Sequence, residues 1–433
     1  MNELQHGTKT QLEAALYGGS LESRLDALRQ LCAQPGERPH RGTNCHIHTN
    51  ESFSVFRSPT EAVSQAAREG LAVLGINDHY TVAGHEEFRQ ACRIAGIGAA
   101  FSMEAVGMDR AAEASGLLLN DPDNPGRVYL CGKGITRIPP DSSASAQSLA
   151  RMRAALERRN RQMTAKMMEL FRERFNAAGP AWKDVLALTP RGNATERHVA
   201  KAALGRLREI AAERGASLAE TIERCCGAAP PATADDAALQ NFTRGKLLKA
   251  GAPCFVRESE DAFVSSEELR RMFLAFGAIP TYPVLGNPVT SGERDVNALL
   301  DRLEGAGFYA IEVIPTRNTR ERLTEIVSAA RSRWWPVFNG TEHNTPEARP
   351  LLDPYALDPE FEPWFCRSIS LMLGHQAAVI RGEAGYVGED GKPAIADARN
   401  RFEYFSRLGC VENQCRLVPG QGEPCPLDRL PQS

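Results

Sequence analysis

The chain has 433 residues, of which 42% are hydrophobic and 24% charged, and its formal net charge is −3. These values are typical of a globular protein with one large α/β domain or two to three ordinary domains, and they argue against a nucleic-acid-binding or membrane-surface protein. No apolar run approaches the ~20 residues that span a bilayer. Because the first residues lack the order of a secretory leader, we interpret the eleven cysteines as reduced thiols and expect a cytoplasmic protein.

The first part of the chain alternates between helical and strand patterns. Residues 9–34 have helical spacing, and a short strand is predicted at 43–49. In "SPTEAVSQAAREG", Ser58 is placed as an N-cap and Gly70 as a C-terminal stop, which predicts a helix between them. "LAVLGINDH" is a nearly continuous apolar run, as expected of a buried parallel strand. Further strands are predicted at 97–107 and 127–135, with a helix at 86–96.

The later part of the chain changes pattern twice. A long basic helix is predicted from 142 to about 175, and helical sequence continues to about 250. Strand-like segments then return at 276–286, 307–315 and 334–344, separated by helices. We therefore predict a parallel α/β sheet or barrel that a helical insertion interrupts. The expected parts are an N-terminal helical extension (1–41), a first barrel part (42–139), the insertion (140–275), a second barrel part (276–350) and a C-terminal extension (351–433).

Polar side chains stand where the predicted strands end. In a parallel barrel, functional groups gather at the carboxyl ends of the strands. Charged groups that follow buried strands are costly unless they are paired or bind a metal, and imidazole with carboxylate is the usual ligand set of Zn, Mn and Fe. Five predicted strands end in such groups: His46 and His48; Asp78 and His79; Glu104; Glu312; and Glu342 and His343.

These motifs resemble those of the polymerase and histidinol phosphatase (PHP) superfamily of metal-dependent hydrolases, in its stand-alone phosphoesterase branch. The stretch from "HIHTNESF" to "GINDHYTVAGHEEF" is similar to the first two motifs, "SMEAVG" to the third, and "GFYAIEVIP" and "NGTEHN" to the last two. "ERHVAKAAL" resembles an arginine–histidine element of that branch, although Arg197 and His198 are adjacent here. The resemblance implies a distorted (β/α)7 barrel and one to three divalent ions of Mn, Zn or Fe. The ligands it implies are His46, His48, His79, Glu104, Glu342 and His343.

Several family positions are altered in this chain. Phe53 stands where an aspartate is usual, Tyr129 and Tyr282 where histidines are, and Glu342 where the last motif has aspartate. The last ligand position falls to His343 or to Asn344. The reduced set fits a site with one or two metals at least as well as a site with three.

The resemblance implies a phosphoesterase that acts on a small phosphorylated metabolite or nucleotide. Asp78 or His79 is the expected general acid or base, and the substrate contacts are expected from Arg197, His198, Tyr129 and Tyr282. Two alternatives stay open. One is a single-metal hydrolase, isomerase or lyase of a sugar or hydroxy acid on the same barrel, and the other is a non-catalytic protein that binds through the barrel mouth. The expected partner is a small molecule, and the oligomeric state is not predicted.

Overall fold

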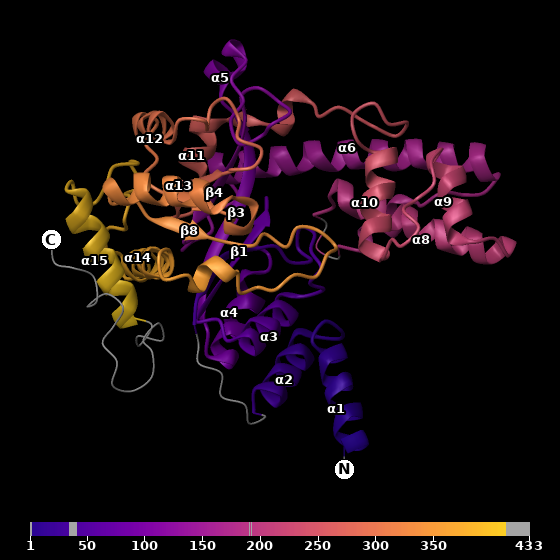
Figure 1. Ribbon diagram of the computed structural model, residues 1–433, viewed down its shortest axis with the longest axis horizontal. Coiled ribbons are helices and arrows are strands. Elements are labelled where there is room, and N and C mark those ends of the chain that lie inside the picture. Colours follow the sequence, from indigo (N-terminus) through magenta and orange to yellow (C-terminus); the bar gives the residue numbers. More distant parts are fainter. Residues whose placement is uncertain (1, 34–40, 190, 192, 413–433) are drawn as a thin grey trace.

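The structure is a computed structural model that describes residues 2–33, 41–189, 191 and 193–412. Its centre is a nearly closed barrel of seven strands. Figure 1 shows helices around these strands. The predicted distorted (β/α)7 barrel is therefore confirmed. The strands neighbour one another in the order β1, β2, β3, β4, β6, β7, β8, and the short β5 pairs with β3. Their bounds are β1 (Thr43–Ile47), β2 (Val73–His79), β3 (Gly98–Met108), β4 (Arg127–Lys133), β5 (Val264–Ser265), β6 (Ile279–Val284), β7 (Ile311–Val313) and β8 (Val337–Asn339).

The barrel nearly closes where the chain after β8 meets the end of β1. The backbone N–H of His48 donates to the carbonyl of Glu342 at 2.7 Å, and the N–H of Glu342 donates to the carbonyl of His46 at 2.8 Å. The N–H of Thr341 also donates to the His46 carbonyl, at 3.2 Å, and these hydrogen bonds bring the loop after β8 beside His46 and His48.

The prediction of a parallel sheet is wrong at β4, which runs antiparallel to both β3 and β6. Only residues 109–126 connect β3 to β4, and their one helix, α5 (Arg110–Ser115), is short. The N–H of Asp109 donates to the carbonyl of Gly126 at 2.7 Å, which turns the chain back on itself. A parallel crossover returns the chain along the strand, usually through a helix, whereas α5 has only 6 residues. The carboxyl ends of the parallel strands lie at one end of the barrel. Because β4 runs the other way, its carboxyl end lies at the opposite end.

Helices cover the outside of the barrel. The predicted helix after β1 is confirmed: the Ser58 side chain caps the N–H of Glu61, and Gly70 ends the helix in a left-handed conformation. Helices α1 and α2 lie beside α3 and α4 (Figure 1), where Leu25 and Leu28 join their apolar core. Near the barrel the helices are α1 (Asn2–Ala15), α2 (Leu21–Cys32), α3 (Pro59–Glu69), α4 (His85–Ala95), α11 (Ser266–Ala275), α12 (Val296–Gly305), α13 (Arg320–Ser332), α14 (Glu362–Ile380) and α15 (Ala398–Glu412), with short 3-10 turns at Glu260–Ala262, Pro315–Arg317 and Pro354–Leu357.

The helical insertion has an apolar core of its own. The long helix α6 (Ala144–Phe175) leaves the barrel and carries the other insertion helices at its far end, as Figure 1 shows. Its first half contributes Met152 to the barrel core, and its second half contributes Met163 and Phe171 to the insertion core. The remaining insertion helices are α7 (Trp182–Leu186), α8 (Glu196–Arg214), α9 (Leu218–Cys226) and α10 (Asp236–Leu247).

The insertion touches the barrel beside the ends of β1 and β2. The side-chain amide of Asn193, just before α8, donates to the carbonyls of Glu51 at 2.9 Å and His79 at 2.8 Å. The ring of His198 meets that of Phe53 edge to face, with centroids 5.0 Å apart. The start of α8 therefore packs against the loops that follow the first two strands.

Helices α14 and α15 pack against each other on the other side of the barrel (Figure 1). His375 of α14 joins them to the barrel: its Nε2–H donates to the carbonyl of Gly277 at 2.8 Å, and its Nδ1 accepts from the N–H of Tyr386 at 3.0 Å. Both ring nitrogens are used, so the neutral ring fits the site. Among the described helices, none combines the length and apolar character needed to cross a membrane.

We expect His375 to make the fold sensitive to acid. Burial lowers the pKa of His375 to about 4, whereas the ring in the unfolded chain has a pKa near 6.5. Between these values the unfolded state binds more protons, so the free energy of unfolding falls as the pH decreases, by about 3 kcal/mol over the whole window. Urea unfolding at a series of pH values tests this. The variant His375→Gln keeps a donor and an acceptor but does not titrate, and an equally steep pH dependence in that variant would contradict the assignment.

Candidate metal centre

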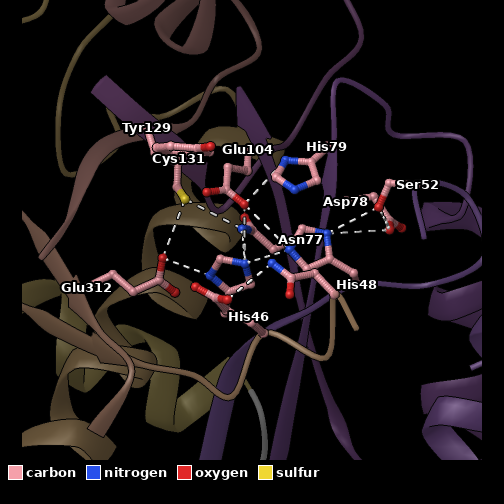
Figure 2. Close-up of polar contacts among 12 residues, drawn as sticks. His46, His48, Ser52, Asn77, Asp78, His79, Glu104, Tyr129, Cys131 and Glu312 are labelled. Carbon is pink, nitrogen blue, oxygen red and sulfur yellow. Dashed lines mark hydrogen bonds and ion pairs between the residues drawn. The ribbon is translucent and has the colours of Figure 1, made fainter. Parts of the chain in front are cut away.

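Four side chains from three neighbouring strands converge inside the barrel. Figure 2 shows His46 of β1, His48 just beyond the end of β1, His79 of β2 and Glu104 of β3 pointing toward one another. The Nε2 atoms of His46 and His48 are 3.0 Å apart, and Glu104 Oε2 lies 3.5 and 3.4 Å from them. His79 Nδ1 lies 3.4 Å from the same carboxylate oxygen. The sequence predicted these four as ligands, and the structure brings them together as the histidine–carboxylate cluster.

The two-residue spacing of a strand explains how β1 and the residue that follows it supply two of these groups. Successive side chains of a strand alternate between its faces, so positions 46 and 48 point the same way. Both side chains face the barrel interior and are 1% and 0% exposed. The two histidines of the motif therefore lie next to each other in the folded protein.

The geometry of three of these groups suits a metal ion. His46, His48 and Glu104 form one of two groups in the described residues whose ligand atoms are close enough to share an ion, and we call it the first donor set. Ligands about 2.0–2.1 Å from a tetrahedral zinc lie about 3.3 Å from one another, and the observed separations are 3.0–3.5 Å. If the Nε2 atoms of His46 and His48 both carried a lone pair, they would repel each other at this distance. A cation or a proton between the two nitrogens removes that repulsion.

The electrostatics of the cluster also favour a cation. Burial lowers the pKa of both His48 and His79 to about 4, so these rings are neutral and have a free lone pair near pH 7. Burial alone would lower the pKa of His46 as well, but the Glu312 carboxylate raises it to about 9. Burial opposes the charge on Glu104, yet the surrounding histidines hold its pKa well below the usual value. The carboxylates therefore draw positive charge into the cluster.

Asp78 holds the loop that follows β1. Its Oδ1 accepts from the N–H of Thr49 at 2.7 Å and from the hydroxyl of Ser52 at 2.6 Å, and its Oδ2 accepts from the Thr49 hydroxyl at 2.6 Å. Ser52 Oγ in turn lies 3.1 Å from His48 Nδ1 (Figure 2). The chain Asp78–Ser52–His48 orients the His48 ring with its Nε2 toward the cluster. Partners of this kind outside the ligand set commonly fix ligating histidines.

A second group of buried side chains lies against the other side of His46. Glu312 Oε2 is 3.0 Å from His46 Nδ1 and 3.4 Å from Cys131 Sγ, and Figure 2 shows all three. Lys133 Nζ donates to Glu312 Oε1 at 2.6 Å and to the Cys45 carbonyl at 3.0 Å. Both members of the Lys133–Glu312 pair are 0% exposed. Burial alone would lower the pKa of Lys133, but Glu312 raises it above its usual value.

The sequence pattern indicates Glu312 only as a strand-end carboxylate and does not indicate Cys131, Lys133 or Asn77 as part of the site. The amide Nδ2 of Asn77, on β2, lies 2.9 Å from His46 Nε2 and 3.4 Å from Cys131 Sγ. Asn77 directly precedes Asp78 in the predicted second strand, and this position was the available signal. Cys131 and Lys133 lie on β4, whose antiparallel direction the sequence pattern did not indicate.

Glu342 and His343 do not join the histidine–carboxylate cluster. Both have positive φ angles, 64° and 56°, so the backbone turns sharply after β8. The Glu342 carboxylate forms an ion pair with Arg317, whose Nη1 lies 2.7 Å from Oε1. His343 Nδ1 contacts the Thr341 hydroxyl at 2.8 Å, and its Nε2 lies 3.0 Å from the carbonyl of Arg349. The next residue, Asn344, donates to Glu342 at 3.1 Å.

The four predicted substrate contacts have different surroundings. Arg197 reaches Asn241 Oδ1 at 3.2 Å and lies 5.9 Å from the Phe53 ring, and burial lowers its pKa to about 10. The ring of His198 caps the start of its own helix, where Nδ1 accepts from a backbone N–H at 3.0 Å. Tyr129 is drawn near Glu104 and Cys131 in Figure 2. The Tyr282 hydroxyl donates to Glu293 at 2.9 Å, so this side chain is committed to a partner outside the cluster.

Comparison with known proteins gives matches among solved structures only. No family model and no curated protein matches the sequence. One similar structure is a protein from Bifidobacterium adolescentis proposed to be a metal-dependent phosphoesterase; it is 20% identical, the match covers 75% of this chain and 97% of that one, and the TM-score is 0.47. Another is an amidohydrolase from Chromobacterium violaceum with bound sulfate and no metal; it is 17% identical, the match covers 72% and 94% of the two chains, and the TM-score is 0.47.

Proposed function

We propose that this protein is a metal-dependent hydrolase of the PHP type and that its preferred substrates are phosphate esters. The observation that carries the proposal is the first donor set, in which two imidazole nitrogens and one carboxylate oxygen lie 3.0–3.5 Å apart in a buried position. Neutral imidazole and carboxylate are the ligands of catalytic zinc, manganese and iron. His46, His48 and Glu104 would hold the ion. When bound, a divalent cation supplies Lewis acidity, which acidifies water and neutralises charge on the scissile group.

Two guanidinium groups support a substrate that carries a phosphate. Arg317 lies beside the end of β1, because its partner Glu342 is hydrogen-bonded there through the backbone. Arg197 lies at the start of α8, over Phe53 of the loop after β1. A guanidinium binds phosphate oxygens through paired N–H groups. We infer that Arg197 orients the phosphate toward the cluster, and that Arg317, whose two Nη groups are paired with Glu342, adds positive charge near the end of β1.

His79 is the better candidate for moving a proton. Its side chain is 23% exposed, whereas His46 and His48 are almost fully buried, so His79 can reach a substrate. Its Nδ1 is buried without a hydrogen-bond partner although Glu104 Oε2 lies 3.4 Å away. Asp78 is fully engaged by Thr49 and Ser52, which suits a positioning role. We therefore assign His79 as the general acid or base, and Asp78 as the group that fixes the loop carrying Ser52.

A second candidate is a single-metal hydrolase, isomerase or lyase of a sugar or hydroxy acid. It is favoured by the small size of the first donor set, which has only three members. Such a reaction needs one cation beside a proton-transferring side chain, and His79 would again supply that side chain.

A substrate panel separates the two candidates. The protein is stripped of metal, reloaded with Mn, Zn or Fe, and assayed on phosphomonoesters, phosphodiesters, sugar acids and amides. The phosphoesterase proposal expects hydrolysis of phosphate esters that depends on added metal, and at least a tenfold higher KM for these esters in Arg197→Lys, which keeps the charge but loses the paired N–H groups. Turnover of sugar acids alone would support the second candidate. No turnover of any class, with stoichiometric metal bound, would contradict both.

A further inference from the structure

The described residues contain two groups that are spaced to hold a metal, and both of them include His46. The second donor set consists of His46, Cys131 and Glu312. A neutral imidazole has one lone pair, so His46 cannot serve two ions without losing its second proton. His46 Nε2 faces His48 and Glu104, while Nδ1 faces Glu312 at 3.0 Å. The ring thus directs its metal-binding nitrogen to the first donor set.

The second donor set already holds a cation of the chain's own. Lys133 Nζ lies 2.6 Å from Glu312 Oε1, within a fully buried pair. The same ammonium reaches the Cys45 carbonyl at 3.0 Å, so it is fixed between β1 and β7. A divalent ion on Glu312 would lie within a few ångströms of this positive charge, where repulsion in a buried site amounts to several kcal/mol.

We propose that Lys133 takes the place of a second metal ion, so that the centre binds a single divalent cation on His46, His48 and Glu104. Glu312, neutralised by Lys133, orients His46 by electrostatic attraction, because its Oε2 lies 3.0 Å from His46 Nδ1 although the pair does not have the geometry of a hydrogen bond. Lys133 and Glu312 are positioning residues in this assignment, which rests on the proposed function. The sequence predicts one to three metal ions per chain, and this proposal reduces that number to one.

Cobalt(II) binding tests the proposal without any substrate. The purified, metal-free full chain is titrated with Co²⁺. Ligand-field bands in the visible report the first donor set, and a sulfur-to-metal charge-transfer band in the near ultraviolet reports ligation by Cys131. For the wild type we expect one equivalent of Co²⁺ and no Cys131-dependent charge-transfer band. In Lys133→Met, which removes the charge but keeps most of the volume, we expect a second equivalent with that band, held by Cys131, Glu312 and a His46 ring that has lost its N–H and bridges the two ions. Second-site binding should be at least about a hundredfold tighter than in the wild type. The band should vanish in Lys133→Met/Cys131→Ser.

The wild-type titration keeps the proposal testable even where Lys133→Met fails to fold. Two equivalents in the wild type, or a charge-transfer band that Cys131→Ser removes, would overturn the proposal and leave the proposed hydrolase intact. A folded Lys133→Met that still binds one equivalent would overturn it too. Failure of the proposed function would give a different result. In that case the wild type would show no Co²⁺ signal that depends on His48, so His48→Ala would change nothing in the titration.

Discussion

Replacing His48 by alanine is expected to remove the bound metal and to lower kcat/KM by at least about a thousandfold. His48 belongs only to the first donor set, so this substitution leaves Glu312, Lys133 and Cys131 as they are. Loss of one of three ligands leaves two, too few to hold a catalytic ion, and each ~1.4 kcal/mol of transition-state stabilisation that is lost slows the reaction tenfold. Metal content by elemental mass spectrometry and steady-state rates on a phosphate ester measure the two effects.

The matched control for that experiment is His375→Gln, which also replaces a buried histidine but lies between α14 and the barrel, bonded to Gly277 and Tyr386. It should retain full metal content at neutral pH. Equal metal loss in both variants would mean that the effect reports damage to the fold. Full metal content in His48→Ala would exclude the first donor set as the binding site.

Replacing Glu312 by glutamine is expected to lower the free energy of unfolding by about 3–5 kcal/mol. The substitution leaves the Lys133 ammonium buried with neutral acceptors only, the Cys45 carbonyl and the new amide oxygen, and a buried charge without its counter-ion is strongly destabilising. The double variant Lys133→Met/Glu312→Gln removes both charges and should recover most of the loss, since exchanging a buried ion pair for neutral groups is often close to neutral. Chemical denaturation of the metal-free chains measures these differences.

A surface pair provides the comparison for Glu312. Glu86 and Arg89 on α4 form an exposed ion pair, with both side chains more than half exposed. Glu86→Gln should change the free energy of unfolding by at most about 1 kcal/mol. If Glu312→Gln were as mild as Glu86→Gln, the Lys133–Glu312 pair would not be the buried neutralising contact described above.

The parts of the site that the sequence predicted follow from local rules. Alternation at the end of β1 and into the residue after it points His46 and His48 the same way, and the parallel pairing of β2 with β3 sets His79 directly opposite Glu104. Helix caps at Ser58 and Gly70 were equally local, because a capping side chain and a left-handed glycine act within one turn of the chain. Such features need no knowledge of distant segments.

The parts that were missed depend on contacts between distant segments. Lys133 meets Glu312 across 179 positions of the chain, and only the reversed strand β4 brings them together. Glu342 follows an apolar strand as a ligand would, but the left-handed backbone at 342 and 343 turns it toward Arg317. Spacing along the sequence cannot distinguish a carboxylate that enters the barrel from one that pairs with an arginine at its rim.

Helix α6 has a consequence for any attempt to exchange the insertion for another domain. Its first turns carry Met152 of the barrel core and a Ser148 hydroxyl that donates to Glu268 at 2.6 Å, while its later turns carry Met163 and Phe171 of the insertion core. A junction placed before α6 would remove Met152 and Ser148, which pack against the barrel, together with the insertion. A workable chimera would join the foreign domain within α6, between residues 152 and 163, and continue the helical register across the junction.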